Sequence, residues 1–257
     1  MRVIDTHTHL YLADFKVDIE EVMNRAAAAG VQKFYLPNID SSTIVDLMHL
    51  EKKYPGQCIA MMGLHPCSVK QNYEEELQTV KEWLGKRAFA AVGEIGLDYY
   101  WDKTFISQQK QAFQQQIEWA LQYDLPIVIH SRDSLQDCIE IVRYNQNGKL
   151  RGIFHCFGGS VEEARQISDL NFLMGIGGVV TYKKAGLAQT LKDIHLSSLV
   201  LETDAPYLTP VPFRGKRNEP AFLQHVISTI AEVKNISVDE VAKITTSNAQ
   251  KLFDKKA

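Results

Sequence analysis

The sequence predicts an α/β fold in the form of a closed TIM (β/α)₈ barrel, and three observations support this prediction. The chain has 257 residues, close to the roughly 250 that such a barrel takes. Short apolar runs alternate with longer amphipathic ones, which is the pattern of repeated strand–helix–strand units and a parallel sheet. There are eight of these apolar runs, and eight is the number of strands in the barrel.

The eight runs are predicted as strands because they consist mostly of Val, Ile, Leu, Phe, Met and Ala, as strands buried on both faces do. Their ranges are Val3–Asp5, Lys33–Leu36, Cys58–Met62, Ala90–Glu94, Ile127–His130, Gly152–Phe154, Phe172–Gly175 and Leu199–Leu201.

The stretches between these strands carry apolar residues at helical spacing. Gly30 suits the end of the first helix, and Ser160 followed by Glu163 forms a capping box. The predicted helices are Asp18–Ala29, Ser41–Lys53, Phe105–Gln122, Ser160–Asp169, Ala221–Val233 and Val238–Leu252. No repeat, low-complexity tract or linker divides the chain, so we expect one domain over residues 1–257.

Composition narrows the class of protein. Hydrophobic residues make up 45% and charged residues 23%, which are ordinary globular values. The cysteines form no C-x-x-C pair, so we expect free thiols in a reducing compartment. No apolar run approaches the roughly 18 residues of a membrane span, and we expect a soluble, cytoplasmic protein. A net charge of −3 argues against avid, non-specific binding to duplexes but does not exclude a nuclease.

Polar residues follow the predicted strands at or just beyond their ends. Because catalytic groups of a (β/α)₈ barrel project from the C-terminal ends of the strands, these residues are candidates for the active site. They are His7, His9, Asn38, His65, Glu94, His130, His155 and Asp204. Five of the eight histidines are among them, whereas chance would scatter histidines over helices and loops as well.

His7 and His9 form an H-x-H motif after the first strand. Side chains two residues apart in a strand face the same way, so both can bind one metal. Asp5 either orients one of these histidines or anchors the turn. Glu94 lies beside Gly93 in a segment whose glycines leave room for a ligand. Its two carboxylate oxygens can bridge a pair of metals.

His130 and His155 end apolar strands, where a polar ring needs a partner such as a metal. Cys156 alternates to the other face and is expected to pack. Asp204 can bind a metal and accept a proton from the attacking water, because its carboxylate is ionised at pH 7. Glu202 is a candidate either for orienting a ligand or for contacting the substrate.

Four histidines and two carboxylates are a mixed nitrogen and oxygen donor set. We expect two divalent ions, with Zn²⁺, Mn²⁺, Co²⁺ and Ni²⁺ favoured by the histidines and Mg²⁺ less so. Two ions about 3.5–4 Å apart can activate a shared water and polarise a phosphoryl or acyl oxygen. The sequence therefore predicts a metal-dependent hydrolase.

A set of motifs in fixed order covers nearly the whole chain. They are D-T-H-T-H-L, G-L-H-P, G-E-I-G-L-D-Y, H-S-R, H-C-F-G-G, E-T-D-A-P-Y-L and R-G-K-R-N-E-P. The chain resembles the TatD family of metal-dependent deoxyribonucleases, within the amidohydrolase superfamily. The resemblance implies a TIM barrel that hydrolyses phosphodiester bonds of DNA or RNA, acting as a 3′–5′ exonuclease on single strands. Some relatives are linked instead to D-aminoacyl-tRNA deacylation, so hydrolysis of another ester or amide stays open.

The same resemblance implies roles for individual residues. His7, His9, Glu94 and Asp204 match the ligands of one metal, and Glu94, His130 and His155 match those of the other. Glu94 and Asp204 are the expected catalytic residues. His65 matches a histidine close to the substrate phosphate.

Further candidates for substrate binding are basic or aromatic. Arg132 either binds an anionic group or forms an ion pair at a helix cap. Arg214, Lys216 and Arg217 either clamp a nucleic-acid backbone or form a solvated charge run. Tyr99, Tyr100 and Trp101 either stack a base or pack the loop. The expected partner is the end of a single-stranded nucleic acid, bound by a monomer without membrane association.

Overall fold

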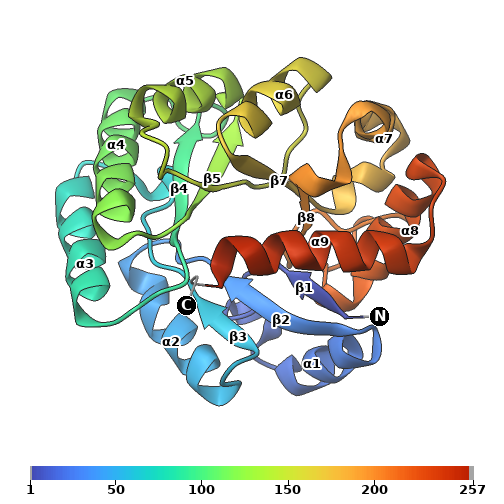
Figure 1. Ribbon diagram of the computed structural model, residues 1–257. Helices are drawn as coiled ribbons and strands as arrows, with labels where there is room; N and C mark the ends of the chain where they lie inside the picture. The colour runs from blue at the N-terminus through green and yellow to red at the C-terminus, as the bar shows by residue number, and fades with distance from the viewer. Residues whose placement is uncertain (1, 255–257) are drawn as a thin grey trace.

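Eight parallel strands surround the axis of the molecule, and helices cover them from outside (Figure 1). The computed structural model describes residues 2–254. The strands are β1 (Val3–Asp5), β2 (Val31–Leu36), β3 (Cys58–Ala60), β4 (Val92–Asp98), β5 (Ile127–Arg132), β6 (Gly152–Phe154), β7 (Phe172–Ile176) and β8 (Leu199–Leu201).

The strands follow one another around the barrel in chain order. β1, β2 and β3 pair in parallel, and β4 to β8 form a second parallel run. A parallel bridge between Met62 and Val92 joins the two runs on one side. On the other side the Thr6 N–H donates to the Leu201 carbonyl over 2.9 Å, which connects β1 to β8. The predicted (β/α)₈ barrel is therefore confirmed.

The helices lie between successive strands and beyond the last one. They are α1 (Ile19–Ala28), α2 (Ile44–Lys53), α3 (Tyr73–Lys86), α4 (Ile106–Tyr123), α5 (Leu135–Asn145), α6 (Val161–Asp169), α7 (Leu187–Thr190), α8 (Leu223–Lys234) and α9 (Val238–Phe253). Three of these helices were not predicted from the sequence. They are α3, which buries only Leu77, Val80 and Leu84, α5, which follows β5 closely, and the short α7. The predicted start of α2 at Ser41 is a 3₁₀ turn capped by Asp40. The capping box at Ser160 is present.

The barrel interior contains an apolar layer with members in five of the strands and others just after β3 and just before β4. Its members are Ile4, Tyr35, Met61, Ala91, Val128, Ile153 and Val200, with Ala249 from α9. The Tyr35 ring stacks on Phe253 at a centroid distance of 3.8 Å, and α9 crosses this end of the barrel (Figure 1). The N-terminal end of the barrel is thereby sealed, and the buried histidines lie toward the C-terminal ends of the strands.

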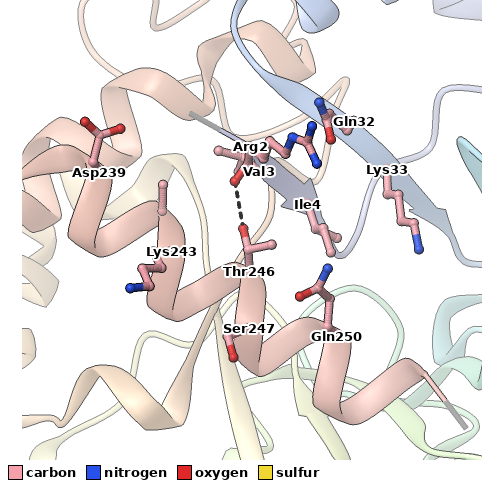
Figure 2. Close-up of a pocket in the computed structure, with 11 residues that line it drawn as sticks. Arg2, Val3, Ile4, Gln32, Lys33, Asp239, Lys243, Thr246, Ser247 and Gln250 are labelled. Carbon is pink, nitrogen blue, oxygen red and sulfur yellow. Dashed lines mark hydrogen bonds between the residues drawn. The ribbon is translucent and has the colours of Figure 1, made fainter.

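A cavity of about 490 Å³ lies on the sealed side, between α9 and the first residues of β1 and β2 (Figure 2). Its polar lining includes Arg2, Lys33, Lys243 and Gln250, and Thr246 donates to the Arg2 carbonyl over 3.0 Å. It holds no cluster of histidines and carboxylates, so we place the functional site at the opposite end. No helix within residues 2–254 has the length and apolarity needed to cross a bilayer.

Candidate metal centre

Glu94 lies inside β4, and its side chain is buried at the mouth of the barrel. The strand predicted over Ala90–Glu94 is displaced along the chain, because β4 begins at Val92 and continues to Asp98. The pairing with β5 shifts in register between Val92 and Ile95. The strand is therefore irregular at Glu94, which lies between these two residues. The glycines before and after Glu94 hide this continuation from an analysis based on apolar runs.

The two carboxylate oxygens of Glu94 face different sets of histidines. Oε2 lies 3.1 Å from His7 Nε2 and 3.5 Å from His9 Nε2. Oε1 faces three ring nitrogens, those of His130 (2.9 Å), His155 (3.0 Å) and His65 (3.3 Å). The carboxylate therefore stands between two groups of nitrogen donors, which is the arrangement that a bridging ligand requires.

Asp204 lies on the same side of Glu94 as the H-x-H pair. Its Oδ1 is 3.5 Å from His9 Nε2 and 3.7 Å from His7 Nε2. Its backbone is in the left-handed region with φ 55°, and its N–H donates to the His7 carbonyl over 2.9 Å. Burial would raise the pKa of Asp204, but the surrounding histidines lower it below its ordinary value.

Asp5 anchors the backbone below this pair. It accepts hydrogen bonds from the His7 N–H (3.3 Å), the Thr203 N–H (3.0 Å) and the Thr203 hydroxyl (2.6 Å). Burial raises the pKa of Asp5 to about 8, although the Thr203 hydrogen bonds oppose that rise. Of the two roles considered for Asp5, the contacts favour fixing the turns that carry His7 and Asp204.

The tautomer of the His9 ring follows from its contact with Tyr11. The Tyr11 hydroxyl donates its only proton to the Pro37 carbonyl over 2.5 Å. The His9 Nδ1, 2.9 Å from the same hydroxyl oxygen, must then donate to it. In the neutral ring this tautomer leaves His9 Nε2 with a lone pair that faces the carboxylates of Glu94 and Asp204, an arrangement that suits a metal ion bound between them.

The neutral His65 ring has the opposite tautomer to that of His9. Its Nδ1 accepts a hydrogen bond from the Cys67 N–H over 3.0 Å, so the proton of the ring is on Nε2. This nitrogen faces Glu94 Oε1. Burial lowers the pKa of His65, but the Glu94 carboxylate outweighs that effect and raises it. In either protonation state His65 offers an N–H donor to the site, which suits contact with a phosphate oxygen.

His130 and His155 are each held by a second carboxylate. His130 Nε2 lies 2.8 Å from Asp98 Oδ2, and His155 Nδ1 lies 3.3 Å from Glu202 Oε1. Carboxylates of this kind fix the tautomer of a ligating histidine and raise its basicity. They leave His130 Nδ1 and His155 Nε2 directed at Glu94.

Glu202 is itself enclosed by backbone. Its Oε1 accepts the Cys156 N–H over 2.5 Å, and a Cβ added to Gly175 would lie 2.0 Å from its Oε2. Glycine at this position of β7 is what lets the buried carboxylate fit. Of the two roles considered for Glu202, the contacts favour orienting His155.

The site has the properties of a place for divalent ions. The donor atoms form three groups, and within each group they lie no more than 4.8 Å apart. The groups are His7–His9–Glu94, His7–His155–Asp204 and His65–Glu94–His130. Burial would raise the pKa of Glu94, yet the histidines hold it well below its ordinary range. Three atoms of this site, His7 Nδ1, His155 Nδ1 and Glu202 Oε2, are buried without a hydrogen-bond partner among the described residues, so His155 Nδ1 is oriented by its ion pair with Glu202 alone. Buried mixed nitrogen and oxygen donors fit Zn²⁺ or another transition-metal ion.

The other predicted residues lie in varied surroundings. Asn38 donates to the Gly63 carbonyl over 2.9 Å and supports a turn. Burial raises the pKa of the Cys156 thiol to about 12, so it is no nucleophile at neutral pH. Arg217 forms an ion pair with Asp18 at 2.6 Å.

The remaining basic residues of that segment contact aromatic rings. The Arg214 guanidinium lies 4.3 Å from the Tyr182 centroid, and the Lys216 amine lies 5.7 Å from that of Phe213. Both residues are otherwise exposed. Substrate binding by Arg214, Lys216 and Arg217 stays a prediction.

Two residues of the site were missed by the sequence analysis, Asp98 and Tyr11. Asp98 is four residues after Glu94 in one strand, and Tyr11 is two residues after His9. The alternation of a strand places residues at even spacing on one face, so the period of two starting from Glu94 could have pointed to Asp98.

Comparison with known proteins identifies the family. The family model described as TatD related DNase matches residues 4–254. YabD of Bacillus subtilis (strain 168), described as an uncharacterized metal-dependent hydrolase, is 41% identical over 252 residues that cover 98% of each chain. YcfH of Escherichia coli (strain K12), described in the same words, is 32% identical over 98% of this chain and 96% of its own.

Solved structures agree with this assignment. The crystal structure of YjjV, a TatD homologue from Escherichia coli K12, superposes with a TM-score of 0.93 at 31% identity and covers 99% of both chains. A TatD family hydrolase from Entamoeba histolytica shares the fold, with a TM-score of 0.83 at 22% identity over 100% of this chain and 99% of its own. The chain therefore belongs to the TatD-related DNase family, metal-dependent hydrolases of the amidohydrolase superfamily.

Proposed function

We propose that this chain hydrolyses phosphodiester bonds at the 3′ ends of single-stranded DNA or RNA, with two divalent ions bound to the cluster around Glu94. The observation that carries the proposal is the division of the Glu94 carboxylate between two sets of histidines. One ion would lie beside His7, His9 and Asp204, and the other beside His130 and His155. Bound there, the ions would polarise a phosphoryl oxygen and acidify a water.

The residues of the chain supply the remaining steps. Asp204 is ionised at neutral pH because its pKa is lowered, and it accepts the proton of the attacking water. The Nε2–H of His65 donates to a non-bridging oxygen of the phosphate, whose negative charge grows in the transition state. Asp98 and Glu202 hold His130 and His155 in the orientation that this geometry needs.

The test is release of mononucleotides from a 3′-labelled single-stranded oligonucleotide. The protein is stripped of metal and then supplied with Mg²⁺, Mn²⁺, Zn²⁺, Co²⁺ or Ni²⁺ in turn. We expect metal-dependent release that falls by roughly 10²–10⁴-fold in Asp204→Asn, which loses the proton acceptor.

A D-aminoacyl-tRNA ester is assayed in parallel, because the same cluster could act on a carbonyl. Hydrolysis of that ester without release from the oligonucleotide, by protein that binds two ions, would overturn the phosphodiesterase proposal in favour of the deacylase.

A further inference from the structure

The loop between β4 and α4 carries two large aromatic side chains that are not packed into the protein. Tyr100 is 51% exposed and Trp101 is 68% exposed. Their rings meet edge to face at a centroid distance of 4.9 Å. Two exposed rings in contact offer an aromatic surface on which a nucleobase can stack. The preceding Tyr99 differs, because its hydroxyl donates to Asp137 over 2.7 Å and its ring lies partly buried against the core.

The exposed rings stand on a backbone that is fixed to the candidate metal centre. Asp98 Oδ1 accepts the N–H groups of Tyr100 (2.9 Å) and Trp101 (3.0 Å). The other oxygen of the same buried carboxylate lies 2.8 Å from His130 Nε2. The position of the two rings is therefore set by the residue that orients His130, so a group bound on them has a defined place relative to the metal cluster.

Arg132 adds a positive charge at the same place. Its guanidinium carbon lies 3.8 Å from the Tyr100 centroid and 5.3 Å from that of Trp101. Within residues 2–254, Arg132 forms no ion pair with a carboxylate. It follows His130 by two residues in β5, so both side chains leave the same face, about 7 Å apart along the strand.

We infer that Tyr100, Trp101 and Arg132 form a subsite for one nucleotide of a single strand, next to the phosphate that is hydrolysed at the metal centre. This inference rests on the proposed function and adds the residues that recognise the strand. Trp101 stacks on the nucleobase. Arg132 binds the phosphate of the same nucleotide, and the ring of Tyr100 holds the Arg132 guanidinium in place. A base can stack on a protein ring only when it has left its own duplex, so the subsite selects single strands.

The ion-pair alternative considered for Arg132 is not supported, because no carboxylate of the described residues pairs with it. The contacts of Tyr99 agree with a packing role, whereas the exposure of Tyr100 and Trp101 leaves their rings available to a ligand. The three consecutive aromatic residues thus divide into one anchor and two contact residues.

The first experiment measures binding without turnover. Metal-free protein is titrated with a short oligothymidylate and with an abasic phosphodiester oligomer of the same length, and tryptophan fluorescence is recorded. We expect saturable quenching by the oligothymidylate only. Trp101→Ala should weaken oligothymidylate binding by about 5- to 100-fold, as measured by a labelled strand. Tyr144→Ala removes another exposed ring, on α5, and should leave that affinity unchanged.

The role of Arg132 is tested by the salt dependence of oligonucleotide binding. Arg132→Ala should weaken binding of both oligomers and reduce the slope of log affinity against log salt by about 0.7, the value for one phosphate of a single strand. Arg165→Ala, which removes a surface arginine paired with Glu162, is the control. With the active holoenzyme, Trp101→Ala should raise KM for an oligothymidylate with little change in kcat, whereas Tyr144→Ala should change neither.

Equal affinity of the wild-type and Trp101→Ala proteins for oligothymidylate, or equal binding of oligothymidylate and the abasic oligomer, would overturn the subsite. Both of these affinity measurements are made on metal-free protein and need no turnover. Base-dependent binding by protein that releases no nucleotide with any metal would refute the proposed hydrolysis and leave the subsite supported.

Discussion

Asp98 Oδ2 lies 2.8 Å from His130 Nε2, and the other nitrogen of that ring lies 2.9 Å from Glu94 Oε1. The carboxylate of Asp98 keeps a proton on Nε2 and leaves Nδ1 for a metal. In Asp98→Asn an amide N–H replaces the acceptor and favours the other tautomer. We expect metal affinity and kcat/KM to fall by roughly 10–100-fold, as measured by metal titration and oligonucleotide hydrolysis.

Asp102→Asn is the matched control for that variant. Asp102 is four residues further along and pairs with Lys70 at 2.6 Å, away from the histidines. Its substitution should leave metal affinity unchanged. An Asp98→Asn protein with wild-type affinity would show that His130 needs no such partner.

Glu94→Gln should abolish hydrolysis while the barrel remains folded. A carboxamide has one acceptor oxygen, so it cannot serve the His7–His9 set and the His130–His155 set together. We expect activity at background, fewer bound ions per chain in metal analysis, and an unchanged circular dichroism spectrum. Glu118→Gln on α4 is the control. Substantial turnover by Glu94→Gln would contradict a bridging role.

Gly175→Ala tests the support of His155. The added Cβ would meet Glu202 Oε2 at 2.0 Å, so the carboxylate or the strand must move. Overpacking of this kind costs about 1–3 kcal/mol of unfolding free energy, and displaced Glu202 would also lower activity. Gly158→Ala is the matched control because nothing lies within 4 Å of its Cβ position. Denaturant unfolding of both variants gives the comparison, and equal stabilities would refute the close fit.

Removal of metal should lower the melting temperature. The donors around Glu94 are preformed in the folded chain and scattered in the unfolded one, so an ion binds the folded state preferentially. At a free metal concentration of 100 Kd this adds about 2.7 kcal/mol of stability. Calorimetry with and without a chelator measures it. Glu94→Gln should show a much smaller difference, and an equal difference would place the stabilising ion elsewhere.

The ion pair between Asp18 and Arg217 should make stability depend on pH. The hydrogen bond from Arg217 lowers the pKa of Asp18 below its ordinary 3.8. The contribution of Asp18 is therefore present above its unfolded pKa and is lost as pH falls through its lower folded pKa. Asp18→Asn should flatten the stability curve below about pH 4, as followed by urea unfolding at several pH values. A curve that matches the wild type would mean that the pair contributes nothing measurable.

The sequence predicts most of the barrel because its strands are nearly pure apolar runs, whose ends place Glu94 and Asp204 at one rim. It misses what depends on contacts between distant segments. The tautomer of His9 depends on a hydrogen bond from Tyr11 to the Pro37 carbonyl, and no local pattern contains this bond. The Asp98 side chain was missed because glycines interrupt β4, and α3 was missed because its apolar stripe is narrow.

The contact of Phe253 with Tyr35 has a consequence for synthesis of the chain. The interior layer includes Ile4 and Ala249, which lie 245 residues apart in the sequence, so the layer is complete only after α9 has left the ribosome. Contacts this distant in sequence close slowly. We expect nascent chains that end before α9 to expose this apolar interior layer and to depend on chaperones until α9 has been synthesised and has packed.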